Sequence, residues 1–125
     1  MNIKLPNIIP VFPLNGIIFF PETNLPLNIF EPRYISLIDD CIKKNKYMGM
    51  IQLKKNNSDV YSVGCLGKIT ENKKTKDGRI IINLIGITRF ETKTEINNDK
   101  IYREFEVSYK KFEIDLEKNK EQSNK

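Results

Sequence analysis

The sequence predicts an α+β domain that is mainly β, a small barrel of about six strands with one main helix. Several segments carry the alternating or continuous apolar pattern of β-strands. Glycines stand within these segments, where a barrel strand turns a corner. Residues 32–45 show the apolar spacing of an amphipathic helix.

Length and composition are those of an ordinary globular domain. The chain has 125 residues, 39% hydrophobic and 30% charged, enough to bury a core without metals or disulfides. No apolar run approaches the roughly 20 residues that a membrane span needs. Prolines interrupt the N-terminal apolar stretch, and no small-residue cleavage site follows it, so we expect a cytoplasmic protein without a signal peptide or a membrane partner.

The first strands are predicted from a proline-rich stretch at residues 10–34. Proline fixes φ and lacks a backbone donor, so no helix runs through the first four prolines. We expect short extended pieces with a turn at Asn15-Gly16, and a helix that begins at Pro32. The extended pieces are a strand at 8–14, a short apolar piece at 17–20 and a second strand at 25–30.

The predicted helix has one apolar stripe, and lysines follow at its C-terminal end, as the helix dipole favours. Asn45 is expected to end it in a left-handed conformation. The stripe consists of Tyr34, Leu37, Ile38, Cys41 and Ile42.

Four strand segments are predicted after the helix. Gly49 marks a bulge or a close backbone approach. Gly64 and Gly67 bend the longest segment, which the Asp77-Gly78 turn joins to the next. That next segment is apolar on both faces, which predicts a central strand, and Gly86 interrupts it. The segments are 47–53, 60–75, 79–91 and 102–112, with a polar connection at 92–100.

The sequence contains PVFPL, IIFFP and LPLNIFEPRY in the proline-rich stretch, and later VGCLGKI and DGRIIINLIGITRFE. With these motifs the chain resembles the N-terminal substrate-binding domain family of Lon proteases, over roughly residues 8 to 110. The resemblance implies a PUA-like pseudo-barrel. It also implies a LON N-terminal-like domain at residues 1–112 and a polar tail at 113–125 that begins a truncated C-terminal helical segment.

The resemblance implies recognition of unfolded, damaged or degron-bearing polypeptides without catalysis. Full Lon proteases resemble this chain only at their start, so a link to proteolysis would require an ATP-dependent protease in trans. No enzyme is expected, because the chain has no histidine, no GxSxG motif and no phosphate-binding GxxxxGK[ST] loop. We expect no cofactor or metal, and Cys41 and Cys65 to be small buried residues.

The proline-aromatic run is the candidate binding surface. Exposed contiguous apolar surface marks interaction sites, so one or two phenylalanines, above all Phe19 or Phe20, are expected to line a shallow apolar groove. The alternative is that all the phenylalanines of this run are buried. An open barrel edge beside the groove is a second way to take an extended chain. The candidate peptide-binding residues are Phe12, Phe19, Phe20, Phe30, Arg33 and Tyr34.

An RNA-binding PUA-like module is the alternative function. The net charge is +5 and the pI is near 9.2. Lysines are mixed with acids along the chain and arginines are few, so a general compositional bias is favoured over nucleic acid. The candidate nucleic-acid contacts are Lys73, Lys74, Lys76 and Arg79 at the predicted hairpin. Arg89 and Arg103 are expected to pair with Glu91, Glu104 or Glu106, or else to contact an anion.

Overall fold

The computed structural model describes residues 4–56 and 58–117 and confirms the α+β prediction. Within these residues six strands form the sheet, one main helix packs against it, and a short 3-10 helix, η1, follows the last strand. Residues 113–117 continue as a helical turn. The elements are β1 Ile8–Leu14, β2 Asn24–Ile29, α1 Pro32–Lys43, β3 Tyr47–Gln52, β4 Val63–Lys74, β5 Ile80–Ile96, β6 Arg103–Ser108 and η1 Lys110–Phe112.

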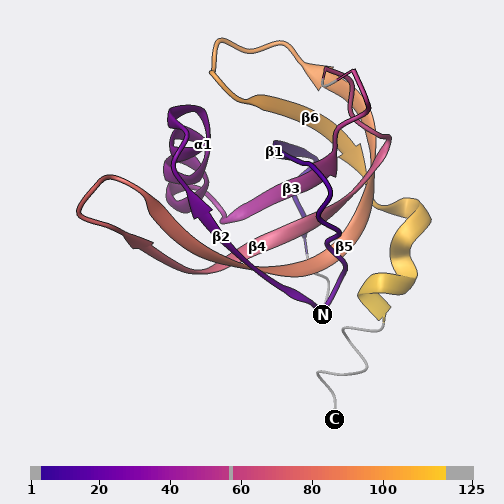
Figure 1. Ribbon diagram of the computed structural model, residues 1–125. Coiled ribbons are helices and arrows are strands. Elements are labelled where there is room, and N and C mark those ends of the chain that lie inside the picture. The colour runs from indigo at the N-terminus through magenta and orange to yellow at the C-terminus, as the bar shows by residue number, and fades with distance from the viewer. Residues whose placement is uncertain (1–3, 57, 118–125) are drawn as a thin grey trace.

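The sheet closes into a barrel because β5 pairs at both of its ends (Figure 1). The strand order is β2-β5-β4-β3-β1-β6, and β6 also pairs with β5. Residues 80–85 of β5 pair with β2, residues 80–91 pair with β4, and residues 91–96 pair with β6. Among the strand pairs of the described residues, β1 and β3 run parallel and the others are antiparallel. The ring therefore contains β5, β4, β3, β1 and β6, with β2 attached outside it.

Strand β5 differs from the sequence prediction in length. The predicted break at Gly86 and the polar connection from residue 92 are wrong, because the strand runs on to Ile96. Residues 91–96 extend because β6 pairs with them and closes the ring. The prediction of a central strand is confirmed, because β5 lies between β2 and β4. Ile80, Ile82 and Leu84 are buried on one face, but Ile81 on the other face is 44% exposed. The outer face of a small barrel is open to water.

Two apolar clusters form the core. One packs the buried stripe residues Leu37, Ile38 and Cys41 of α1 against the sheet. The other surrounds Phe90 inside the ring. A Cβ on Gly49 would lie 2.7 Å from Ile9 Cδ1, which confirms the predicted close approach, although the contact is with side chains. Both cysteines are buried and free, also as predicted.

Turn chemistry was predicted correctly at the hairpin and incorrectly at the end of the helix. Gly78 has φ +91° in the β4–β5 turn, where Thr75 N donates to Arg79 O at 2.9 Å. After α1 the left-handed residue is Lys46, with φ +67°, and not Asn45. The side chain of Asn45 instead accepts a hydrogen bond from Tyr47 N at 3.1 Å, which stabilises the turn into β3.

Candidate functional site

The connection between β1 and β2 carries a run of exposed apolar side chains. Ile17 is 45% exposed, Ile18 72% and Phe20 56%, while Phe19 between them is only 9% exposed. Single exposed apolar residues are common on protein surfaces, but a contiguous group marks an interaction site. The sequence alternative in which all the phenylalanines are buried is therefore wrong.

Close packing against the barrel orients Phe20 outward. Phe19 belongs to the core around α1, and its ring lies against Gly67. Glu22 N donates to Gly86 O, and Gly86 N donates to Thr23 O, both at 2.8 Å. A Cβ on Gly86 would lie 2.1 Å from the carbonyl oxygen of Phe20. The connection thus lies directly on a glycine of β5, and its path leaves the Phe20 ring in solvent.

Two shallow hollows lie beside Phe20, and both are lined by Phe20 and Arg89. The first, which we call the Phe20 groove, has a volume of about 190 Å³ and is mostly apolar. The second, which we call the Asp115 hollow, has a volume of about 250 Å³ and is more polar. The groove is lined by Leu14, Ile18, Phe19, Phe20, Met50, Gln52, Val63, Gly64, Cys65 and Arg89. Phe20, Pro21, Glu22, Arg89 and Asp115 line the hollow.

Arg89 and Asp115 form a bidentate ion pair at the Asp115 hollow. Arg89 Nε donates to Asp115 Oδ2 and Nη2 to Oδ1, both at 3.0 Å, and the backbone N of Arg89 also donates to Oδ2 at 3.0 Å. These bonds from Arg89 lower the pKa of the Asp115 carboxyl. The predicted glutamate partners are wrong for both arginines, because Arg103 pairs with Glu95 at 2.7 Å. Asp115 lies in the segment predicted to be a polar tail, and Glu95 lies in the segment predicted to be a polar connection.

The predicted peptide-binding residues do not form one site. Only Phe19 and Phe20 line the groove. The rings of Phe12 and Tyr34 pack 4.5 Å apart between β1 and α1, and Arg33 lies over Tyr34 at 5.9 Å. Phe30 is 65% exposed but does not line the groove. Sequence reasoning missed the groove residues Ile18, Val63 and Arg89, whose common location depends on contacts far apart in the chain.

The predicted basic hairpin is exposed, but half of its charge is neutralised. Arg79 pairs with Asp77 at 2.9 Å, and Lys74 pairs with Asp39 of α1 at 3.4 Å. Figure 1 shows the β4–β5 hairpin extending on the same side of the barrel as α1. Lys73 and Lys76 remain as exposed cations at the tip. Phosphate binding depends on the number of available cations, so the structure gives this site limited support.

Strand β2 is an edge of the sheet, and Pro26 near its centre obstructs the addition of a further strand. Thr23 lies opposite Gly86, and its carbonyl oxygen accepts a hydrogen bond from Gly86 N. The backbone N–H and C=O groups of alternate residues from Leu25 onward therefore point toward β5. Pro26 therefore has its backbone nitrogen on the outer side, where it offers no donor to an added strand. Pro26 thus interrupts the row of backbone donors that an added strand would use at this edge.

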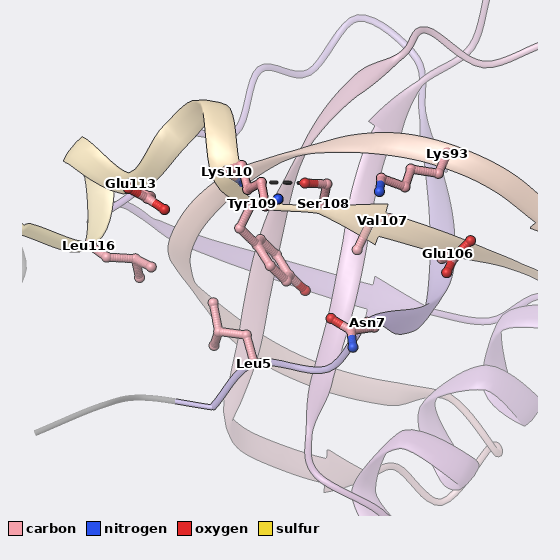
Figure 2. Close-up of a pocket in the computed structure, with 10 residues that line it drawn as sticks. All are labelled: Leu5, Asn7, Lys93, Glu106, Val107, Ser108, Tyr109, Lys110, Glu113 and Leu116. Atoms are coloured by element: carbon pink, nitrogen blue, oxygen red, sulfur yellow. Dashed lines mark hydrogen bonds between the residues drawn. The ribbon is translucent and has the colours of Figure 1, made fainter.

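A further hollow lies between β6 and the helical turns that follow it (Figure 2). It has a volume of about 420 Å³. Figure 2 shows Leu5 and Leu116 on one side and the charged side chains of Lys93 and Glu106 on the other, with the ring of Tyr109 directed toward the N-terminal segment that carries Leu5 and Asn7. Tyr109 Oη donates to Pro6 O at 2.5 Å, so this tyrosine holds the N-terminal segment.

Two classes of site are absent from the described ranges. Within residues 4–56 and 58–117, no three His, Cys, Asp or Glu side chains are grouped to hold a metal ion. No helix in that part of the chain has the length and apolar character to cross a membrane.

Comparisons with known proteins agree on one family. A family model described as the ATP-dependent protease La (LON) substrate-binding domain matches residues 8–125. A Lon protease of Desulfosudis oleivorans is 31% identical over 103 residues, covering 77% of this chain and 13% of that protein. A Lon protease of Elusimicrobium minutum is 31% identical over 91 residues, covering 68% and 11%. The chain thus spans only a small part of these relatives.

Solved structures give the same result for the fold. The crystal structure of a Lon N-terminal domain protein from Xanthomonas campestris matches with a TM-score of 0.70 at 25% identity, covering 82% of this chain and 59% of that one. The N-terminal domain of a Mycobacterium avium complex Lon protease matches with a TM-score of 0.67 at 16% identity, covering 82% and 54%. The second likeness concerns the fold alone.

Proposed function

The chain belongs to the ATP-dependent protease La (LON) substrate-binding domain family, and on that basis we propose that it recognises unfolded, damaged or degron-bearing polypeptides. The matched domain is the substrate-binding part of such proteases and not the ATPase or protease part. Binding here involves no covalent step. We include in the proposal a cytoplasmic setting and an ATP-dependent protease that acts in trans on the bound polypeptide.

The observation that carries the proposal is the outward Phe20 beside an apolar groove. Phe20 is 56% exposed, and its neighbours Ile18 and Val63 are 72% and 41% exposed. A folded protein buries its large apolar side chains, whereas an unfolded segment presents them in no fixed shape. A shallow groove with several apolar walls suits a side chain of variable shape better than a deep, polar pocket would.

The size of the groove predicts weak binding for each contact. Fully burying one Val, Leu, Ile or Phe side chain contributes about 1.5–3 kcal/mol. A dissociation constant of 1 mM already requires about 4 kcal/mol. One side chain in the Phe20 groove is therefore insufficient, and useful affinity requires a segment with several apolar residues. An unfolded chain presents such a segment, whereas a folded protein buries most of its large apolar side chains.

We also propose the domain division that the sequence predicts, a LON N-terminal-like domain at residues 1–112 and a helical segment that begins in residues 113–125. Residues 113–117 are helical, and the family model continues to residue 125. Residues 118–125 lie outside the described ranges.

The test compares two probes at low and high salt: a reduced, carboxymethylated protein that stays unfolded, and a structured RNA. We expect binding to the unfolded protein that changes little with salt and is weakened by Phe20→Ser. The matched control is Ile101→Ser, because Ile101 is 58% exposed and lies outside the groove. Circular dichroism and thermal unfolding check that both variants keep the fold.

Two outcomes would overturn the proposal. Salt-sensitive binding to RNA alone would favour the RNA-binding alternative, and Lys73 and Lys76 would then be the residues to substitute. Equal loss of unfolded-protein binding in Phe20→Ser and Ile101→Ser would show that the groove has no special part in recognition.

A further inference from the structure

Charged contacts hold the C-terminal turns of residues 110–117 on the barrel, and the apolar side chains Phe112 and Leu116 of these turns are only half-buried. Asp115 is the only one of these residues whose side chain is buried, at 7% exposure. Lys111 Nζ pairs with Glu91 at 2.6 Å, and the ring of Phe112 lies 4.7 Å from the guanidinium of Arg89. Figure 1 shows these turns beside the far end of the barrel from α1. Undocking them would withdraw no buried apolar side chain of their own from the core.

The Asp115 carboxylate lies in a well-formed carboxylate site. Three N–H groups of Arg89, namely the backbone N, Nε and Nη2, each donate to it at 3.0 Å. A planar guanidinium binds any carboxylate in this bidentate way, and a backbone donor adds directional specificity. The lowered pKa of Asp115 shows that the site favours the ionised form.

Arg89 also lines the Phe20 groove, so the carboxylate site and the apolar groove adjoin. Its side chain is 45% exposed although it is paired with Asp115. A polypeptide in the groove would therefore pass within reach of this guanidinium.

We propose that Arg89 is a carboxylate subsite of the Phe20 groove, filled by Asp115 in the free domain and by a carboxylate of the bound polypeptide in the complex. This inference rests on the proposed function and specifies its substrate class as apolar segments that carry an adjacent carboxylate. An acidic side chain and the carboxyl terminus of a polypeptide offer the same chemistry.

Replacing Asp115 by a carboxylate of the polypeptide exchanges one ion pair of Arg89 for another of the same kind. The free-energy cost of the exchange is therefore that of undocking residues 110–117. Because Asp115 is tethered, its effective concentration is on the order of millimolar. Asp115 therefore masks the subsite against weak ligands. Removing the Asp115 carboxylate should reveal the preference of Arg89 for peptides that carry a carboxylate.

The test uses the whole chain and two pairs of apolar peptides, labelled for fluorescence anisotropy. One pair ends in a carboxylate or an amide, and the other carries an internal Glu or Gln. Asp115→Ala should bind the carboxylate member of at least one pair about tenfold more tightly than the unsubstituted protein does, and bind neutral peptides equally well. Which pair responds identifies the source of the carboxylate.

Two substitutions of arginine provide the contrast. Arg89→Gln in the Asp115→Ala background should abolish the preference for the carboxylate peptide over its neutral counterpart and leave the binding of neutral peptides intact. Arg103→Gln in the same background is the matched control, because Arg103 forms a similar bidentate pair with Glu95 outside the groove. Phe20→Ser should weaken both members of each pair, so failure of the groove is distinguishable from failure of the subsite.

A measurement on the unsubstituted protein keeps the proposal testable if a variant does not fold. The carboxylate peptide should shift the Nε resonance of Arg89 in ¹⁵N spectra, and its amide or Gln counterpart should not. Equal shifts from both members of each pair would overturn the inference. So would an Asp115→Ala protein that folds and shows no preference for a carboxylate.

Discussion

Substituting Gly86 by alanine should displace the connection that presents Phe20. The added Cβ would lie 2.1 Å from the Phe20 carbonyl oxygen and 3.0 Å from Pro21 Cα. Both are backbone atoms, so no side-chain rotation relieves the clash. The connection must move by about 1 Å to bring the first distance to 3.0 Å. That shift acts directly on the Glu22–Gly86 and Gly86–Thr23 hydrogen bonds of 2.8 Å.

The expected loss of stability combines two effects. Overpacking a well-packed site costs about 1–3 kcal/mol. Each of the two hydrogen bonds contributes about 0.5–1.5 kcal/mol if it breaks. We therefore expect Gly86→Ala to lower the free energy of unfolding by about 2–6 kcal/mol. With an m-value of about 2 kcal/mol/M, the urea midpoint should fall by about 1–3 M.

Urea unfolding and peptide binding together test this reasoning. Gly16→Ala is the control in the same connection, because Gly16 has φ +78° and open space around its Cβ position. It should cost about 1–2 kcal/mol through its left-handed conformation alone and should leave groove binding unchanged. The reasoning is refuted if Gly86→Ala keeps the stability of the unsubstituted protein and binds unfolded polypeptide equally well.

Three further predictions follow from buried groups. Phe19→Ala should lower the free energy of unfolding by about 3–5 kcal/mol in urea titrations, because its ring is part of the core; a loss below about 1 kcal/mol would contradict that placement. Burial raises the pKa of the Cys41 and Cys65 thiols to about 12, so both should react with a disulfide reagent at pH 8 far more slowly in the native protein than in guanidinium chloride. Rapid reaction of either native thiol would contradict its burial. The bonds from Arg89 lower the folded-state pKa of Asp115, so their stabilisation is complete above the ordinary aspartate pKa of about 4 and is lost as the pH falls through the lowered value. Urea midpoints at pH 7 and pH 3 should differ less in Asp115→Asn than in the unsubstituted protein, and an equal difference would count against this linkage.

The sequence by itself determined the fold class, most element positions and the family. These properties depend on local patterns: alternation in strands, the stripe of α1, and the Asp77-Gly78 turn, which takes the predicted conformation. The buried cysteines were predictable for a similar reason, because small apolar residues within apolar patterns belong to the core.

Only the tertiary structure decided which side chains form the candidate site. Phe19 and Phe20 are adjacent and chemically identical, and the path of the backbone over Gly86 is what turns one inward and the other outward. Arg89 finds Asp115 because β5 lies beside the C-terminal turns, a contact between residues 26 positions apart. The extension of β5 to Ile96 likewise depends on pairing with β6. Local preferences carry no information about such contacts, because their free energy arises only when the barrel closes.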